Sequence, residues 1–309
     1  MSKRFLSILS VVVIFAFIAY MIWDSVRTEK PSKPALVSGD SLIPDMWQVA
    51  SQTKIGQGNL KAVCVSKTGT VYLGGSSFVS SYDDSLRLLW TLPVEQPVTA
   101  IACSGDSVFA ASTDIVMVIS KDGKQLNEFG PYEKNSIITS LSAGKYLIAI
   151  ADAGNRTIYL IDKGGEVKKM IGGNDNQFVI PSAYFDVSYN ENNELFVANT
   201  GHRRIEKRSK EGSLEEYFGE PGTAAGAFCG CCNPAHFTAI PGGFITAEKG
   251  INRIKILNTK GEFVEFVTAH NDFVPSAPLD IASADGKTIY AANSSNSTLY
   301  TYKRKNGNQ

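Results

Sequence analysis

Three cysteines and a histidine lie within eight residues of the chain, in the segment AFCGCCNPAHF at residues 227–237. Cys229, Cys231, Cys232 and His236 offer thiolate and imidazole ligands, a set that suits zinc, copper or iron. In an oxidising compartment the thiols pair instead, as Cys229–Cys232, Cys229–Cys231 or the strained neighbours Cys231–Cys232. Any one pairing leaves an odd thiol, which favours a metal or redox site. The segment therefore predicts a disulfide clip, a metal or redox site, or an unpaired structural loop, and the fold around it must decide.

The composition excludes several classes of protein. The 309 residues include 30 Lys and Arg against 30 Asp and Glu, so net charge does not favour nucleic acid as a partner. Five cysteines are too few for a disulfide scaffold, and no Ser–His–acid set, phosphate loop or paired-carboxylate motif stands out, which weighs against an enzyme. Cys64 and Cys103 lie in apolar segments, where we expect buried, reduced thiols too far apart to bond.

The N-terminal part predicts a membrane anchor. Lys3 and Arg4 precede an uncharged apolar run of nineteen residues at 5–23, long enough as a helix to cross a hydrocarbon core of about 30 Å. We interpret residues 1–4 as a short cytoplasmic tail, 5–23 as a transmembrane signal anchor and 24–45 as a linker. The remainder is then extracytoplasmic, on the periplasmic side of a bacterial inner membrane.

Six short apolar segments recur through the remainder of the chain, each with a small residue at its fourth position. They are VYLGG (71–75), VFAAS (108–112), IAIAD (148–152), LFVAN (195–199), FITAE (244–248) and IYAAN (289–293). Their starts are 37, 40, 47, 49 and 45 residues apart, the period of a four-stranded propeller blade. The repeat predicts an all-β fold, a six-bladed β-propeller over residues 46–305. Blade 6 lacks a fourth strand at the C-terminal end, so we expect residues 46–55 to supply it.

Three further segments resemble the NHL-repeat family of propellers. IADAGNRTI (150–158), VANTGHRRI (197–205) and TAEKGINRI (246–254) are similar to the run that joins the second and third strands of NHL blades. The GCCNP loop also resembles one in bacterial membrane-anchored NHL-type proteins. The resemblance implies a six-bladed propeller that acts mostly as an interaction platform, since lyases and hydrolases are a minority of the family.

The blade register places the cysteine-rich segment on one face. It forms the link from blade 4 to blade 5, and these links share a face with the loops between second and third strands. We expect His236 near the mouth of the central channel, and we expect His202 and His270 on the same face as more distant ligand candidates. Arg203, Glu248 and Lys249 border the segment as further candidates for the binding face, although an acidic residue at the position of Glu248 commonly bonds its own turn.

These observations predict a membrane-tethered binding module that takes a protein or a small ligand on the face with the cysteines. The first alternative is a metal-binding or redox protein that uses Cys229, Cys231, Cys232 and His236. A lyase-like metalloenzyme of the NHL propeller class is a further alternative.

Overall fold

The computed structural model describes residues 5, 12–20, 23, 46–173, 177–269, 273, 277 and 279–305. The chain divides into two compact units, Met1–Ser41 and Leu42–Gln309.

The first unit contains the predicted membrane anchor. Residues 12–20 are helical and their side chains are exposed. Among the described residues, no helix has both the length and the apolar character needed to cross a membrane. The predicted span over residues 5–23 lies partly outside the described residues, and the tail (1–4) and linker (24–45) lie wholly outside them, so these remain predictions.

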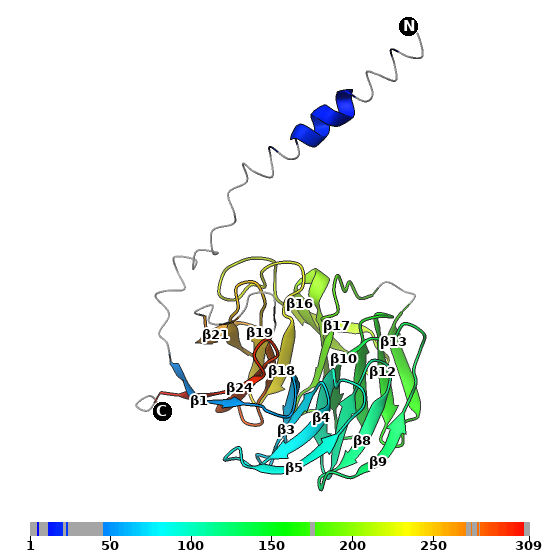
Figure 1. Cartoon of the computed structure of the whole chain (residues 1–309), viewed down its shortest axis with the longest axis vertical. Coiled ribbons are helices and arrows are strands. Elements are labelled where there is room, and N and C mark those ends of the chain that lie inside the picture. Colours follow the sequence, from blue (N-terminus) through cyan, green and yellow to red (C-terminus); the bar gives the residue numbers. More distant parts are fainter. Residues whose placement is uncertain are drawn as a thin grey trace. The chain divides into compact units, whose positions relative to one another are not determined.

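The second unit is built from antiparallel β-sheets (Figure 1). Its described residues form six sheets of four strands, and five of these sheets follow the chain order. Blades 1 to 3 consist of β2 (Leu60–Val65), β3 (Val71–Gly75), β4 (Phe78–Tyr82), β5 (Leu88–Pro93), β6 (Ala100–Ser104), β7 (Ser107–Ala111), β8 (Val116–Ser120), β9 (Gln125–Phe129), β10 (Ile138–Ala143), β11 (Leu147–Asp152), β12 (Thr157–Asp162) and β13 (Val167–Gly172). Blades 4 to 6 consist of β14 (Asp186–Tyr189), β15 (Leu195–Asn199), β16 (Arg204–Arg208), β17 (Leu214–Phe218), β18 (His236–Ile240), β19 (Gly243–Ala247), β20 (Ile254–Asn258), β21 (Phe263–Thr268), β22 (Leu279–Ala282), β23 (Thr288–Asn293), β24 (Thr298–Arg304) and β1 (Trp47–Lys54).

The six blades form a closed ring. Each innermost strand (β2, β6, β10, β14, β18 or β22) contacts the innermost strands of the two neighbouring blades. The described part of the chain has six hydrophobic clusters, and each combines side chains from two adjacent blades. The second strands are buried on both faces because a blade packs on either side of them, which explains their continuous apolar runs. The six-bladed propeller predicted from the repeat is confirmed.

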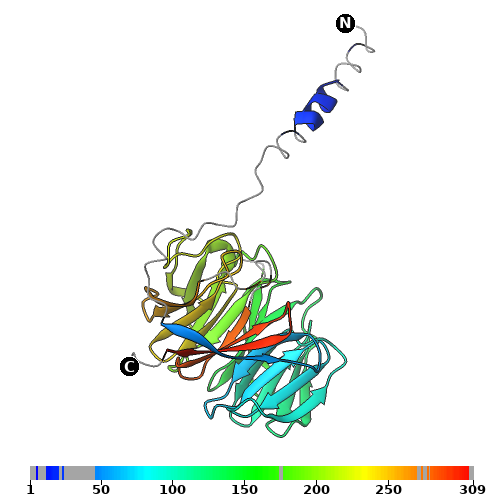
Figure 2. The ribbon, with the colours of Figure 1, turned by 60° about the vertical axis from the view of Figure 1, so that its left-hand side comes forward.

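The ring closes through the N-terminal strand, as expected. β1 pairs antiparallel with β24, so the sheet order of blade 6 is β1-β24-β23-β22. Figure 2 shows the blue N-terminal strand lying beside the red C-terminal ones. The Trp47 side chain is 1% exposed in the seam between blades 5 and 6, and the Arg304 guanidinium lies 5.1 Å from its ring centroid. Strands from the two ends of the propeller sequence therefore share one sheet.

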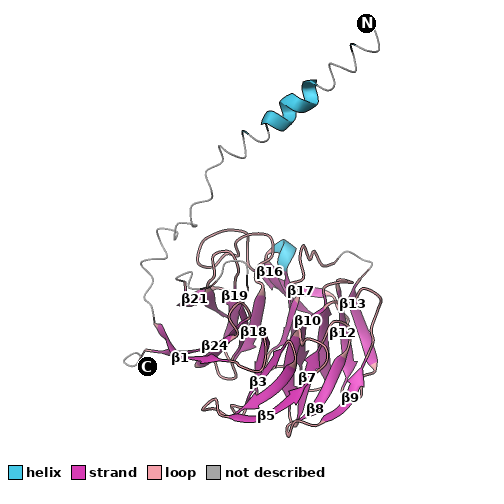
Figure 3. Ribbon diagram, in the orientation of Figure 1, coloured by secondary structure: helices cyan, strands magenta, loops and turns pink. Residues whose placement is uncertain are grey.

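One of the described loops between second and third strands contains a 3-10 turn. The turn, η2, spans Thr200–His202 between β15 and β16 and is the cyan element beside β16 in Figure 3. It belongs to the loops between second and third strands, on the face expected to carry the cysteine-rich segment.

Candidate functional site

Six equivalent positions form a ring around the channel, one from each innermost strand. Each position lies opposite the small fourth residue of the second strand, as in the pairs Asp186–Ala198 and His236–Ala247. The six residues are Ala62, Ala100, Ser140, Asp186, His236 and Asp280. Blades 1 and 2 thus contribute methyl groups and blades 3 to 6 contribute polar side chains, so one sector of a symmetric fold is chemically distinct.

The ring borders a cavity of about 190 Å³ along the channel, lined by residues of all six innermost strands. Asp186, His236 and Asp280 are among the lining residues. Pockets for drug-sized ligands usually measure about 300–1,000 Å³, so this cavity suits a smaller molecule.

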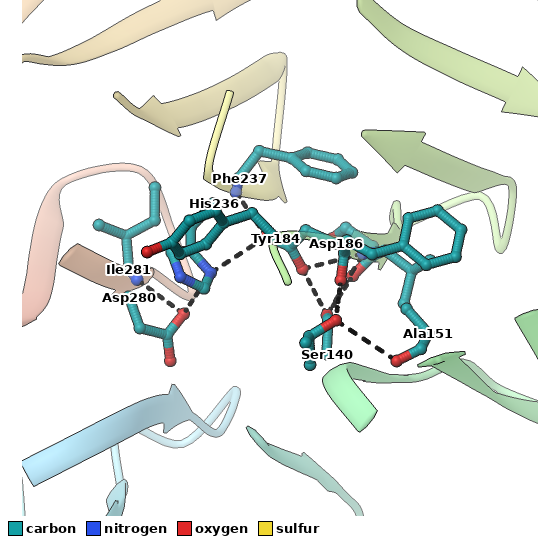
Figure 4. Close-up of polar contacts among 12 residues, drawn as sticks. Ser140, Ala151, Tyr184, Asp186, His236, Phe237, Asp280 and Ile281 are labelled. Carbon is teal, nitrogen blue, oxygen red and sulfur yellow. Dashed lines mark hydrogen bonds and ion pairs between the residues drawn. The ribbon is translucent and has the colours of Figure 1, made fainter. Parts of the chain in front are cut away.

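His236 lies between the two carboxylates of the ring. Its Nδ1 is 3.6 Å from Asp186 Oδ2 and 3.5 Å from Asp280 Oδ1. Figure 4 shows the imidazole between the two aspartates, which come from the blades on either side. The side chains of His236 and Asp280 are 18% and 21% exposed, so solvent or a small ligand reaches them.

Asp186 also joins three neighbouring blades. Ser140 Oγ on blade 3 donates a hydrogen bond to Asp186 Oδ1, and the backbone N–H of Val187 donates to the same oxygen at 2.8 Å. The N–H of Phe237 on blade 5 donates to Oδ2 at 2.7 Å. The carboxylate therefore satisfies N–H groups of two innermost strands and supports the site at the same time.

Asp280 performs the same task between blades 6 and 1. Its Oδ2 accepts the N–H of Val63 at 2.8 Å, and its Oδ1 accepts the N–H of Ile281 at 3.0 Å. Burial raises the pKa of the Asp280 carboxyl from 3.8 to about 6. The positive charge of His236 opposes this rise, and the negative charge of Asp186 adds to it. Asp280 therefore changes its protonation state closer to neutral pH than an ordinary aspartate.

The pKa of His236 is raised, whereas burial alone would lower the pKa of a histidine. Burial disfavours the imidazolium, but the nearby carboxylates of Asp186 and Asp280 outweigh it and raise the pKa of His236 above 6.5. A carboxyl with a raised pKa beside a histidine with a raised pKa makes a group that can give and accept protons near neutral pH.

A tyrosine and a lysine connect the ring to the cysteine-rich loop. The Tyr184 ring lies edge-on to His236 with 6.4 Å between centroids, and Lys249 Nζ is 4.2 Å from the Tyr184 centroid. Lys249 also lies near enough to Cys232 for its charge to favour the thiolate. The loop and His236 are therefore linked through Tyr184 and Lys249.

The loop contains a pair of neighbouring thiols. Cys231 is exposed and Cys232 is buried, and their Sγ atoms are 3.1 Å apart. Ser182 Oγ, from the link between blades 3 and 4, donates a hydrogen bond to Cys232 Sγ at 3.0 Å. All five cysteines are free thiols in the structure, and none is paired in a clip.

Hydrogen bonds fix the loop to the following hairpin. The Asn233 side-chain amide donates to the carbonyls of Cys229 and, at 2.9 Å, Lys249, while the N–H of Lys249 donates to Asn233 Oδ1 at 3.0 Å. The N–H of Cys229 donates to Glu248 Oε2 at 3.3 Å. The cysteines are thus held on an anchored loop.

Glu248 is the centre of a buried ionic cluster. Its Oε1 is 2.7 Å from Arg253 Nε and 3.0 Å from Lys255 Nζ, and all three side chains are fully buried. Arg253 and Lys255 also donate to the Ala227 carbonyl just before the cysteines. These contacts fit the structural interpretation of Glu248, which holds the loop.

The other predicted ligands are not gathered with the cysteines. Within the described residues, no group of three or more His, Cys, Asp or Glu side chains is arranged to hold a metal ion. His202 is exposed on η2, and Arg203 reaches the loop only through a 3.5 Å hydrogen bond to the Gly230 carbonyl. His270 lies outside the described residues. A zinc, copper or iron site at Cys229, Cys231, Cys232 and His236 therefore has no support from the geometry.

The two remaining cysteines lie on the innermost strands of blades 1 and 2. Cys64 is buried as predicted, Cys103 is half-buried, and both line the channel from adjacent blades. Burial, followed by the neighbouring Cys103 thiol, raises the pKa of Cys64. Neither thiol is paired in a disulfide.

Sequence reasoning missed Ser140, Asp186 and Asp280. A signal for them exists, because each occupies the innermost-strand position opposite the small fourth residue of its repeat. Aligning the blades on that residue would have put all three in one ring with His236.

Comparison with known proteins supports the propeller fold and nothing beyond the fold. No protein-family model matches the chain, and no curated protein matches it in sequence. A solved streptogramin B lyase is 13% identical with a TM-score of 0.56, covering 84% of this chain and 98% of the lyase. A catalytically inactive histidine-to-alanine variant of virginiamycin B lyase from Staphylococcus aureus, solved with quinupristin, is 18% identical with a TM-score of 0.57, covering 80% of this chain and 82% of the other. The selenomethionine form of the Staphylococcus aureus enzyme is 15% identical with a TM-score of 0.57, covering 83% and 99%. These likenesses are to six-bladed propellers and show the fold.

Proposed function

We propose that this protein is a membrane-tethered, extracytoplasmic propeller that binds a small polar ligand at the channel mouth, on the face with the cysteine-rich loop. The observation that carries the proposal is the position of His236 between Asp186 and Asp280 beside a cavity of about 190 Å³. The tether rests on the apolar run at residues 5–23 and its orientation on Lys3 and Arg4 ahead of it.

The charges of the site indicate the chemistry of the ligand. With His236 protonated and both aspartates ionised, the three groups have a net charge of minus one. A ligand that presents a positive charge or several N–H donors would complement them. The size of the cavity limits the ligand to a small amine, amidine or similar cation, whereas a protein partner would dock on the rim.

A binding measurement tests this proposal. The full chain, in a mild non-ionic detergent, would be titrated with agmatine, benzamidine and choline by calorimetry, with acetate as an anionic control. We expect one or more cations to bind, and Asp280→Asn to weaken binding about tenfold or more, the loss of one charge contact in a half-buried site. The matched control is Asp106→Asn, which removes an exposed carboxylate with 82% of its side chain accessible. Equal affinity in the wild type and the Asp280→Asn variant, or binding of acetate alone, would contradict the proposal.

An acid–base enzyme is a second candidate, favoured by the raised pKa values of His236 and Asp280. The solved structures similar in fold include streptogramin B lyases, one of them an inactive histidine-to-alanine variant. Incubation of the full chain with quinupristin, followed by mass spectrometry, tests this candidate. Conversion that is lost in His236→Ala would support lyase chemistry, whereas an unchanged substrate would remove this substrate class.

A further inference from the structure

The two neighbouring thiols of the loop differ in their surroundings. Cys231 is exposed, whereas Cys232 is 4% exposed beneath it, and 3.1 Å separates their sulfur atoms. A disulfide bond measures about 2.05 Å, so the sulfurs need to approach by only about 1 Å to bond. Gly230, just before them, has a φ of +76° and no heavy atom within 4 Å of the place its Cβ would take, which leaves the loop room to adjust.

We propose that Cys231 and Cys232 form a thiol–disulfide exchange site, in which Cys231 attacks the disulfide of a reaction partner and Cys232 resolves the mixed disulfide. The site is distinct from the ligand site at His236 and does not depend on the function proposed for it.

The exchange conserves atoms and electrons. The Cys231 thiolate bonds to one sulfur of the partner disulfide and releases the other as a thiolate. The Cys232 thiolate then attacks Cys231 Sγ, forms the Cys231–Cys232 bond and releases the second partner thiolate. The two cysteines lose two protons and two electrons, and the partner disulfide takes up both electrons and becomes two thiols.

The difference in exposure between Cys231 and Cys232 indicates which thiol attacks first. The exposed Cys231 is the sulfur that a partner disulfide can reach. Burial raises the pKa of Cys232 and keeps that thiol from reacting first, whereas the hydrogen bond from Ser182 and the charge of Lys249 favour its thiolate. Cys232 therefore has local support as the resolving thiol once Cys231 is occupied.

A disulfide between Cys231 and Cys232 is strained, because the two residues are neighbours in the sequence, and it is therefore readily reversed. Consecutive Cα atoms are about 3.8 Å apart, less than the roughly 4.4–6.8 Å found across ordinary disulfides. A strained disulfide has a higher reduction potential and is readily reduced again. The pair therefore suits the exchange of electrons with other thiols better than permanent stabilisation of the loop.

Glutathione disulfide is the probe for a direct test. The reduced full chain in detergent is treated anaerobically with an excess of the probe, alkylated, and examined by intact mass and peptide mapping. The wild type should lose two free thiols, retain no glutathione and give one peptide with Cys231 bonded to Cys232. Cys232→Ser and Cys232→Ala should each retain one glutathione on Cys231, and Cys231→Ser should react several-fold more slowly.

Two further variants complete the test. Cys229→Ser should form the same bond as the wild type, and Lys249→Met should slow its formation several-fold because it removes the cation beside Cys232. A wild type that keeps all its thiols, that stays glutathionylated at Cys231, or that links Cys229 to Cys232 would overturn the proposal. Circular dichroism of each variant separates loss of exchange from loss of fold, and none of these outcomes depends on ligand binding at His236.

Discussion

Glu248→Gln is the substitution that most sharply tests how the cysteine-rich loop is held. Glutamine preserves the shape of the side chain and a carbonyl oxygen, but it removes the negative charge shared by Arg253 and Lys255. Both cations lie within 3.0 Å of Glu248 Oε1 and have no exposed side-chain surface. The variant leaves two buried positive charges without this carboxylate.

The expected magnitude follows from the burial of the cluster. Removing one partner of a buried ion pair costs about 3–5 kcal/mol, whereas an exposed pair contributes about 1 kcal/mol or less. For a domain of this size each kcal/mol lowers Tm by about 2–4 °C, so Glu248→Gln should lower Tm by roughly 6–20 °C. Because the N–H of Cys229 donates to Glu248, we also expect the cysteines to react faster with a thiol reagent.

Thermal denaturation of the full chain measures the first effect, and thiol labelling of the native state measures the second. The matched control is again Asp106→Asn, whose partner Lys121 lies 3.2 Å away with 57% of its side chain exposed. The control should unfold within about 1 kcal/mol of the wild type. A Glu248→Gln variant as stable as the control, with unchanged labelling of Cys232, would refute the idea that this cluster holds the loop.

Two further predictions concern Asp280 at the channel and the strand β1 that closes the propeller. The pKa of Asp280 is about 6 in the folded protein, above 3.8, so its protonation contributes stability that is fully present below pH 4 and lost as the pH rises through 6. Free energies of unfolding in urea from pH 4 to 7 should therefore show the wild type losing about 2 kcal/mol relative to Asp280→Asn, and parallel profiles would contradict the shift. Trp47→Ala should cost about 3–5 kcal/mol because it empties the seam that β1 closes, whereas Leu126→Ala, 62% exposed on an outer strand, should change stability by under about 1 kcal/mol. Thermal denaturation measures both, and a Trp47→Ala variant as stable as Leu126→Ala would contradict closure by β1.

The fold was predictable because every blade has to meet the same packing requirements. A second strand packed between two blades must be apolar on both faces and small where it faces the ring, as in VYLGG and IYAAN. Closure was also predictable, since a blade with three strands leaves an unpaired sheet edge that residues 46–55 can fill. These features depend on local patterns that the sequence displays directly.

The site was only half predictable. The cysteines and His236 stand out by residue type and spacing, and the blade register places them on one face. Asp186 and Asp280 stand alone in apolar strands, and nothing local marks them as neighbours of a histidine 50 and 44 residues away. Their proximity comes from the ring, which only the alignment of all six innermost strands reveals.

The ring also explains why the residues of the proposed ligand site contribute to stability as well. Asp186 and Asp280 each accept a backbone N–H from the next blade, so each carboxylate that flanks His236 also joins two blades. Replacing either one by alanine leaves a backbone donor without its acceptor, at about 1–3 kcal/mol, before any ligand is considered. Asparagine removes the charge and keeps one acceptor oxygen for the N–H of the next blade, although its NH2 group replaces the oxygen that accepts the second backbone N–H. A loss of binding in Asp280→Asn with little loss of stability would therefore report on the electrostatics of the site rather than on the integrity of the ring.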